Sequence, residues 1–255
     1  MAQKNVQKTV LVTGGAKRLG REIALALAKA GWRVAVHYRG SEGEALETSN
    51  ACSVHTSGSM CFKADLNNEY EARGLIPAVI AAFGHLDAVV NNASTFEFDV
   101  VQDFSYEKLM QHMLGNVGAP ILLAQGLHLH VKSRGAKGVV LNLLDQKLWN
   151  INPDFLSYSL SKAALQMASS MLAQSLAPDV RVCAIAPGLS FPSYLQDEAA
   201  FARTAKYSLT GEISHPEDIA KAAVFMLDTG SVSGATLLVD GGQHLTAMGR
   251  DVSFL

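Results

Sequence analysis

Short, β-branched apolar runs alternate with longer segments of helical periodicity along almost the whole chain, and this alternation restricts the possible folds more than any other feature. The expected strands are Thr9–Val12, Arg33–Tyr38, Met60–Lys63, Ala88–Asn91, Gly138–Leu143, Val180–Ala186 and Ala235–Val239. The expected helices are Gly20–Ala30, Glu69–Phe83, Tyr106–Gly115, Ala119–Val131, Ser157–Ala177 and Pro216–Leu227. The strands are almost continuously apolar, as strands covered by helices on both faces are. The pattern predicts an α/β fold, a single Rossmann-type doubly wound parallel sheet of about seven strands with helices on both faces.

Composition indicates one globular domain over residues 1–255 and excludes several classes of function. Apolar residues make up 49% of the 255 residues and charged residues 17%, which is far from the composition of a disordered chain. The formal net charge of −2 gives no basic surplus for nucleic acid or for an anionic membrane. We therefore expect a small-molecule partner, and neither nucleic acid nor a membrane.

Cysteine usage and the N-terminal residues predict a cytoplasmic protein. The three cysteines, Cys52, Cys61 and Cys183, form no CxxC pair, so neither a disulfide framework nor a metal site is expected. Residues 1–8 are polar and lack the apolar core of a signal peptide. No apolar run approaches the roughly 18 residues that a membrane span needs.

A glycine-rich segment joins the first expected strand to the first expected helix and reads Thr-Gly-Gly-Ala-Lys-Arg-Leu-Gly over residues 13–20. Gly14 allows a tight turn, Gly20 allows close packing of helix and strand, and the free N–H groups of the helix N-terminus favour a phosphate. The usual spacing would place another glycine at position 18. This chain has Arg18 there, and a guanidinium can grip a pyrophosphate and also contact a substrate. The context predicts a dinucleotide site.

The end of the second strand favours NADP over NAD. An NAD site places Asp or Glu near this point, whereas the chain reads His-Tyr-Arg-Gly-Ser over residues 37–41. Arg39 and Ser41 can hold a 2′-phosphate, so NADP(H) is the predicted cofactor and NAD the alternative. Asp65, after the third strand, is expected to accept a hydrogen bond from the adenine amino group.

Tyr158 and Lys162 are four residues apart, which places them on one face of a helix. A tyrosine hydroxyl has a pKa of about 10, and a nearby ammonium favours the tyrosinate. We therefore expect Lys162 to lower the pKa of Tyr158, so that the hydroxyl donates a proton near neutral pH. Lys162 can also hold the nicotinamide ribose.

Together these motifs resemble the short-chain dehydrogenase/reductase family over about residues 8–245. The matching residues are Thr13–Gly20, Asn91–Ala93, Asn116, Tyr158 with Lys162, Pro187–Gly188 and Val239–Gly242. Ordinary members carry a serine about a dozen residues before the tyrosine, and it hydrogen-bonds the substrate oxygen. Asp145 occupies that place here, and residues 134–156 contain no Ser or Thr.

The aspartate changes which chemistry is favoured. An ionised carboxylate beside a developing alkoxide is repulsive by several kcal/mol in a dry site, which disfavours ketone chemistry unless Asp145 stays protonated. A carboxyl group can instead relay a proton to a ring nitrogen while hydride adds to the neighbouring carbon of a C=N bond. This favours a nitrogen heterocycle as substrate.

Within that family the chain is similar to the pteridine reductases and the bacterial dihydromonapterin reductases. The similarity rests on residues 13–20, His37-Tyr38, residues 91–96, Asp145 and residues 187–190. It implies NADPH-dependent reduction of a dihydropterin, with Ser94 hydrogen-bonding the pterin, Phe96 stacking on it and Asn116 holding a proton-relay water. It also implies a homotetramer, in which Arg250 is a candidate substrate contact in a neighbouring subunit. Residues 188–210 form the expected substrate loop.

The predicted site then comprises three overlapping groups of residues. The catalytic residues are Tyr158, Lys162, Asp145 and Asn116. The cofactor-binding residues are Gly14, Lys17, Arg18, Leu19, Gly20, His37, Tyr38, Arg39, Ser41, Asp65, Leu66, Asn92, Ala93, Lys162, Pro187, Gly188 and Ser190. The substrate-binding residues are Arg18, Ser94, Phe96, Asp145 and Tyr158.

Two other functions stay open on the sequence. A short-chain carbonyl reductase or alcohol dehydrogenase of unknown substrate would need a protonated Asp145, or another donor such as Ser94. A cofactor-binding regulatory protein without turnover is disfavoured, because such a protein has no physical need for both Tyr158 and Lys162.

Overall fold

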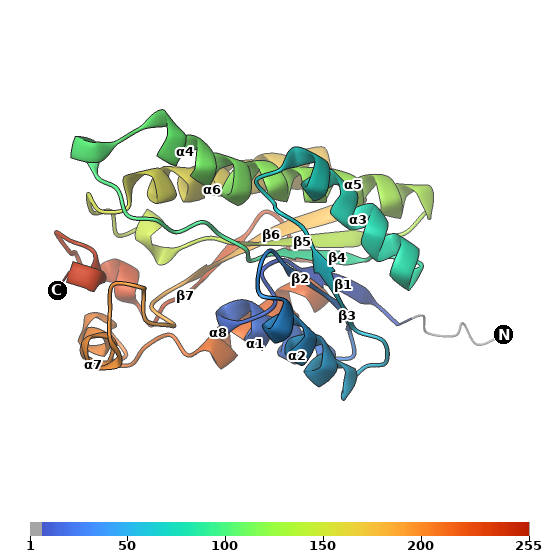
Figure 1. Ribbon diagram of the computed structural model, residues 1–255, viewed down its shortest axis with the longest axis horizontal. Coiled ribbons are helices and arrows are strands. Elements are labelled where there is room, and N and C mark those ends of the chain that lie inside the picture. The colour runs from blue at the N-terminus through green and yellow to red at the C-terminus, as the bar shows by residue number, and fades with distance from the viewer. Residues whose placement is uncertain (1–6, 255) are drawn as a thin grey trace.

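The computed structural model describes residues 7–254, and it contains one parallel sheet of seven strands in the order β3-β2-β1-β4-β5-β6-β7 (Figure 1). The strands are β1 (Thr9–Val12), β2 (Arg33–Tyr38), β3 (Met60–Lys63), β4 (Ala88–Asn91), β5 (Gly138–Leu143), β6 (Val180–Pro187) and β7 (Thr236–Val239). The predicted α/β sheet is confirmed. The expectation of a polar N-terminal segment without a signal peptide concerns residues 1–6, which lie outside the described part.

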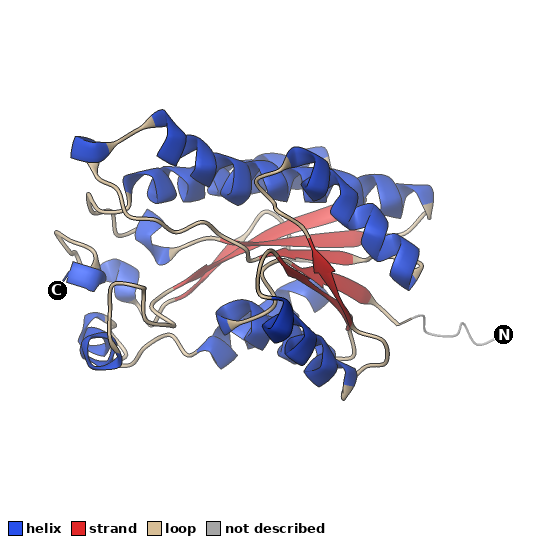
Figure 2. Cartoon of the chain, viewed as in Figure 1, coloured by secondary structure: helices blue, strands red, loops and turns tan. Residues whose placement is uncertain are grey.

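Helices cover both faces of the sheet, as Figure 2 shows. One layer holds α1 (Arg18–Lys29), α2 (Glu42–Ser53) and α8 (Pro216–Asp228), and the other holds α3 (Glu69–Phe83), α4 (Tyr106–Met113), α5 (Ala119–Ser133) and α6 (Leu156–Ser175). Side chains of β1 alternate between the layers: Val10 and Val12 pack into one core and Leu11 into the other. All three are fully buried, which explains why the strand has no polar face.

Helix α2 was not predicted from the sequence. Its buried face is made of Ala45, Thr48, Ser49 and Cys52, which are small or polar, so the segment has no apolar period to reveal a helix. The Thr48 hydroxyl donates to the Ala16 carbonyl oxygen at 2.8 Å. The helix therefore supports the glycine-rich segment through a hydrogen bond.

Several other boundaries differ from the sequence prediction, most by one or two residues. Helix α1 begins at Arg18 instead of Gly20 and ends before Gly31, whose φ of 92° suits a glycine. The helix expected over 106–115 ends at Met113 and continues through a π-helical turn, Leu114–Gly118, into α5. The expected substrate loop contains the short helix α7 (Glu198–Arg203) and a 3-10 turn, Thr204–Tyr207.

The strand order reverses between β1 and β4, and the site opens there. Connections from these two strands leave the carboxyl edge of the sheet in opposite directions, which creates a crevice between them. Within residues 7–254, no helix is both long enough and apolar enough to cross a bilayer.

Candidate active site

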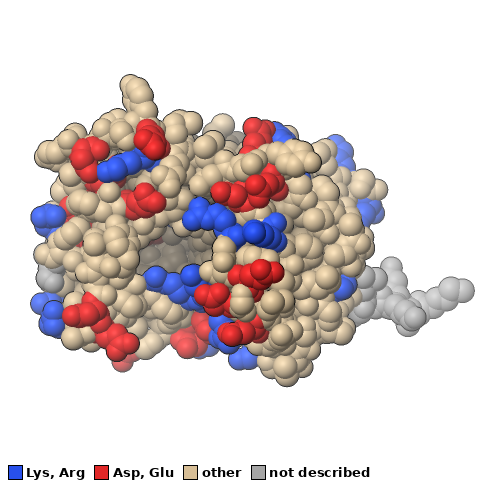
Figure 3. All heavy atoms as spheres, in the orientation of Figure 1, with Lys and Arg blue, Asp and Glu red and all other residues tan. Residues whose placement is uncertain are grey.

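A cleft of about 790 Å³ lies beyond the carboxyl ends of the strands. Figure 3 shows the hollow on this face, with Lys and Arg side chains beside it. The structure places every predicted cofactor-binding and substrate-binding residue on its lining, together with Asp145, Tyr158 and Lys162. The distances and partners of these side chains decide what the cleft can do.

The glycine-rich segment is shaped to accept a phosphate group. Gly14 has a φ of 61°, and a Cβ at Gly20 would overlap the Gly14 carbonyl oxygen. Lys17 is the N-cap of α1 but makes no side-chain cap, so the first N–H groups of the helix are available to a ligand. Arg18 takes a φ of 52°, the conformation of the glycine that usually stands there. These features fit a dinucleotide pyrophosphate.

His37 lies beneath this segment and is 2% exposed. Its Nδ1 accepts the Gly14 N–H at 3.0 Å, and its Nε2 lies 3.1 Å from the Ala64 carbonyl oxygen. Burial lowers the pKa of His37 to about 4, so the ring is neutral at physiological pH with its proton on Nε2. The ring thus fixes the position of the Gly14 backbone.

The end of β4 is joined to the end of β1 by short hydrogen bonds. The Asn92 Nδ2 donates to the Thr13 carbonyl oxygen at 2.9 Å and to that of Gly14 at 3.2 Å. The Ala93 N–H donates to the Thr13 hydroxyl at 3.0 Å. These bonds hold the central part of the cleft in one geometry.

Arg39, Ser41 and Asp65, the residues expected to contact the adenosine part of the cofactor, all line the cleft. The exposed Arg39 follows β2 directly, and Ser41 immediately precedes α2. The Asp65 carboxylate accepts from the Asn67 N–H at 3.0 Å, which leaves its second oxygen for a ligand.

Asp145 and Tyr158 form a buried pair at the centre of the cleft. The Tyr158 hydroxyl donates to Asp145 Oδ2 at 2.8 Å, and the Lys147 N–H donates to Oδ1 at 2.8 Å. Burial raises the pKa of Asp145, against the opposing effects of these two donors and of the Lys162 and Lys147 ammonium groups. Burial, followed by the Asp145 charge, raises the pKa of Tyr158 well above its ordinary value. Burial therefore disfavours the ionised form of each partner.

The expected effect of Lys162 on Tyr158 is wrong in this structure. The Lys162 Nζ lies 5.6 Å from the centre of the tyrosine ring and donates to the Leu143 carbonyl oxygen at 2.7 Å. Burial lowers the pKa of Lys162 itself to about 8, and the pKa of Tyr158 rises because desolvation and Asp145 oppose ionisation. The i, i+4 spacing was predicted correctly, whereas the burial of the two side chains was not foreseen.

Asn116 does not line the cleft. It lies in the π-helical turn after α4, and its amide donates to the Thr95 carbonyl oxygen at 3.0 Å and to the Ser161 hydroxyl at 2.9 Å. Its Oδ1 accepts from the Ser94 hydroxyl at 3.2 Å. The contacts show Asn116 orienting Ser94, and its role with a relay water stays a prediction.

Phe96 lines the cleft. One of its faces stacks on Phe155, with ring centroids 4.3 Å apart and planes at 13°, and the Tyr158 ring lies 4.7 Å away at an angle of 83°. Phe155 is fully buried and starts α6 with a φ of 58°. A flat ligand can therefore stack on Phe96 from one side only.

Arg18 also contacts the expected substrate loop, residues 188–210. Its Nη2 donates to the Pro192 carbonyl oxygen at 2.8 Å, and the guanidinium lies 5.3 Å from the centre of the Phe191 ring. The same residue therefore links the glycine-rich segment to the expected substrate loop.

Sequence reasoning did not name several residues of the lining, among them Lys147, Asp251 and Ser253, and it included Tyr194 only as part of the expected substrate loop. Lys147 is two positions from Asp145, which is a local signal that could have found it. Arg250 pairs with Asp154 of its own chain at 2.8 Å, and its role as a substrate contact in a neighbouring subunit stays a prediction. In the part of the chain that the structure describes, no group of three or more His, Cys, Asp or Glu side chains is placed to hold a metal ion.

Comparison with known families agrees with this geometry. The family model described as Enoyl-(Acyl carrier protein) reductase, a short-chain dehydrogenase/reductase model, matches residues 14–244. The chain therefore belongs to the short-chain dehydrogenase/reductase family of oxidoreductases.

Two similar solved structures are described as FolM Alternative dihydrofolate reductase 1, one from Brucella canis and one from Brucella suis, both in complex with NADP. Each is 33% identical to this chain and covers 96% of it; the match covers 96% and 98% of the Brucella chains, with TM-scores of 0.87 and 0.89. Among curated proteins, 3beta-hydroxysteroid dehydrogenase 1 of Eggerthella lenta is 32% identical over 93% of this chain and 94% of its own length.

Proposed function

We propose that this chain is an NADPH-dependent reductase of a dihydropterin, transferring hydride to a C=N bond of a fused nitrogen heterocycle. The observation that carries the proposal is the buried hydrogen bond between Tyr158 and Asp145, at 2.8 Å. A carboxyl group held with its proton at this position suits a ring nitrogen that must be protonated as hydride arrives.

The choice of cofactor rests on the shape of the cleft and on the Brucella structures, which hold NADP. The uncapped N-terminus of α1 and the glycines at 14 and 20 would bind the pyrophosphate. Arg39 and Ser41 would hold the 2′-phosphate, and Lys162 the nicotinamide ribose. When bound, NADPH supplies the hydride.

The residues of the chain then supply the proton. Asp145 releases its proton to the ring nitrogen, and the resulting carboxylate is stabilised by the Tyr158 hydroxyl and the Lys147 N–H that already donate to it. The Lys162 ammonium adds a further opposite charge nearby. Phe96 and Ser94 would position the flat ring, Phe96 by its free face and Ser94 by its hydroxyl.

The test is NADPH oxidation by purified protein offered dihydrobiopterin, dihydromonapterin and a panel of ketones. Asp145→Ser and Asp145→Asn are compared with the unchanged chain. We expect pterin turnover to fall about 100-fold or more in both variants, because neither side chain donates a carboxyl proton. Full pterin activity in Asp145→Ser, or a preference of the unchanged chain for ketones, would refute the proposal.

A carbonyl reductase is the second candidate, and one observation favours it. Because burial raises the pKa of Asp145, the carboxyl group can stay neutral beside a developing alkoxide, which removes the repulsion that disfavours ketones. The hydroxysteroid dehydrogenase of Eggerthella lenta shows that similar chains act on alcohols. The same substrate panel separates the two candidates.

A homotetramer and a cytoplasmic location also stay predictions. Exposed apolar side chains on α5 and α6 support self-association, namely Leu129, Leu160, Met167 and Met171, which are 64%, 46%, 64% and 63% exposed. Light scattering of the purified protein gives the mass of the assembly, and a monomer would refute the tetramer.

A further inference from the structure

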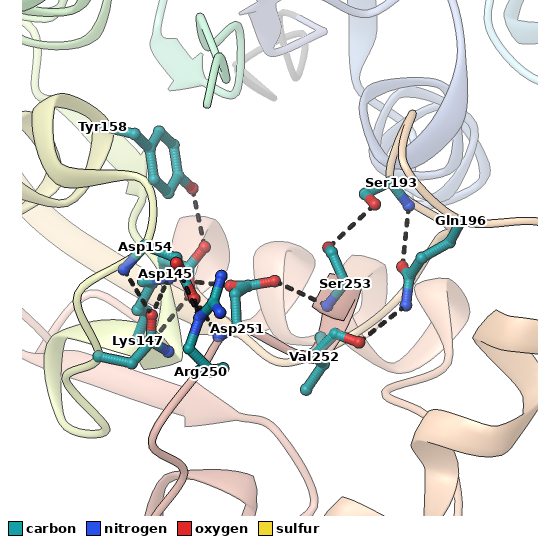
Figure 4. Close-up of polar contacts among 11 residues, drawn as sticks. Asp145, Lys147, Asp154, Tyr158, Ser193, Gln196, Arg250, Asp251, Val252 and Ser253 are labelled. Atoms are coloured by element: carbon teal, nitrogen blue, oxygen red, sulfur yellow. Dashed lines mark hydrogen bonds and ion pairs between the residues drawn. The ribbon is translucent and has the colours of Figure 1, made fainter. Parts of the chain in front are cut away.

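The C-terminal segment of the chain, residues 250–253, lies against the substrate side of its own cleft (Figure 4). The Arg250 Nε donates to Asp154 Oδ2 at 2.8 Å, and the Asp251 N–H donates to the same oxygen at 2.7 Å. Asp154 is 1% exposed, so its charge is matched by this segment and not by solvent.

The other end of the segment contacts the expected substrate loop. The Ser253 and Ser193 hydroxyls are 3.0 Å apart, and the Gln196 amide donates to the Val252 carbonyl oxygen at 3.3 Å. Residues 250–253 therefore join the loop that carries Asp145 to the loop that follows β6. This arrangement holds the Asp251 side chain in one place.

That side chain pairs with a buried cation. The Asp251 Oδ2 lies 2.9 Å from the Lys147 Nζ, and the Asn152 Oδ1 accepts from the same ammonium at 2.6 Å. The side chains of Lys147 and Asp251 are only 5% and 15% exposed, so little water screens their charges. Lys147 follows Asp145 by two residues and donates its backbone N–H to that carboxyl group, and the charge of its ammonium lowers the pKa of Asp145.

We propose that Asp251 is a positioning residue that holds the Lys147 ammonium at the C-terminal segment and neutralises its charge, so that Asp145 keeps its proton. The inference rests on the proposed function, in which Asp145 delivers that proton. An unpaired ammonium beside Asp145 would favour the carboxylate, whereas the ion pair has almost no net charge.

The other charged and titratable groups around Asp145 come from α4, α6, the loop after β5 and the C-terminal segment. They are His112, whose ring lies 6.4 Å from that of Tyr158, Tyr158 itself, Lys162, and the mutually paired Asp154 and Arg250. Lys162 is bound to a backbone carbonyl oxygen of β5 and has no acidic side chain as hydrogen-bond partner among the described residues. Of the two lysines whose charge acts on Asp145, Lys147 is therefore the one that an acidic partner neutralises.

The test measures the protonation of Asp145 directly, by infrared titration of its carboxyl band in the protein without substrate. Asp145→Asn identifies the band by removing it. In Asp251→Asn we expect the apparent pKa of Asp145 to fall by about one unit, because the unpaired ammonium stabilises the carboxylate. The double variant Lys147→Gln/Asp251→Asn should return the pKa to its original value, because both charges are then gone.

A matched control comes from the opposite edge of the sheet. Asp228→Asn removes an exposed aspartate that pairs with Lys8 at 3.1 Å, and it should leave the band unchanged. An unchanged pKa in Asp251→Asn, or a double variant that stays shifted, would overturn the inference.

Turnover gives a second measurement in the same variants. If the chain reduces pterins, the alkaline limb of the rate against pH should move to lower pH in Asp251→Asn, with about tenfold lower activity on that limb. A merely structural role would lower the rate equally at all pH values. If the chain reduces no pterin while the band shifts as expected, the proposed substrate is wrong and the role of Asp251 stands.

Discussion

The two sides of the cleft are held together in different ways. On the proposed cofactor side, formed by the glycine-rich segment and the end of β4, Gly14 and Gly20 are in close contact with each other and with the Asn92 side-chain amide, and all three lie at a fixed spacing from a strand. The proposed substrate side is formed by the loops after β5 and β6 and by residues 250–253. Its contacts include side chains that are far apart in the chain, such as Lys147 and Asp251, which are 104 positions apart. The close packing of the cofactor side can be recognised as a local sequence motif and leaves no room for an added atom. The contacts of the substrate side correspond to no sequence motif, and each can be removed by a single substitution.

Substituting Gly20 tests the cofactor side most severely. A Cβ there would overlap the Gly14 carbonyl oxygen and lie 2.6 Å from the Asn92 Nδ2, so the segment must shift. We expect Gly20→Ala to weaken NADPH binding by roughly 100-fold, or to destabilise the fold by about 2–3 kcal/mol. Fluorescence titration with NADPH and urea unfolding measure the two effects.

Gly74→Ala is the matched control, because Gly74 lies within α3 and a Cβ there meets nothing within 4 Å. It should leave NADPH binding unchanged and raise stability by about 0.5–1 kcal/mol, since alanine favours a helix. Equal affinity in Gly20→Ala and Gly74→Ala would show that the cofactor side is not closely packed around the glycine.

The pH dependence of the free energy of unfolding is a second test of the cofactor side, because His37 is buried beneath the glycine-rich segment. Its pKa is about 4 in the folded protein and about 6.5 when exposed, so the unfolded chain binds the proton more tightly. The stabilisation is complete above pH 6.5 and is lost as the pH falls toward 4. Between pH 7 and pH 5 the loss is about 2 kcal/mol.

Urea unfolding of the unchanged chain and of His37→Gln at both pH values isolates this contribution. Glutamine keeps an acceptor for the Gly14 N–H and a donor for Ala64, but does not titrate. The variant should lose about 2 kcal/mol less than the unchanged chain on acidification. Equal losses would mean that the ring is not held neutral beneath the segment.

The same contrast explains how far the sequence predicted the molecule. All seven strands were expected from their mainly apolar runs, which in β1, β4 and β5 are buried on both faces, but α2 was missed because its buried face includes Thr48 and Ser49. Tyr158, Lys162 and Asp145 were named from spacing and resemblance. The direction of the Tyr158 pKa was wrong, because desolvation depends on how the finished fold excludes water and not on spacing. Asp251 had no local signal, since its partner lies 104 positions away.

Substituting Arg250 tests the ion pair that holds the C-terminal segment, residues 250–253, against the substrate side of the cleft. Asp154 is buried and retains the Asp251 N–H as a donor, but it loses the charge that matches its own. We expect Arg250→Gln to cost about 1–2 kcal/mol and to raise the KM for substrate severalfold, while NADPH affinity stays the same. A weakened NADPH affinity of the same size would show that the two sides are not independent.

Ser253 should show the smallest effect. Its hydroxyl meets that of Ser193 at 3.0 Å, and both residues are partly exposed, so water can replace the bond in the variant. We expect Ser253→Ala to change stability by less than about 0.5 kcal/mol and the KM by less than about twofold. Combined with Arg250→Gln it should give more than the sum of the single effects, because the segment then retains little that fixes it to either loop. Simple additivity of the two substitutions would mean that residues 250–253 do not act as one unit and that their contacts contribute independently of one another.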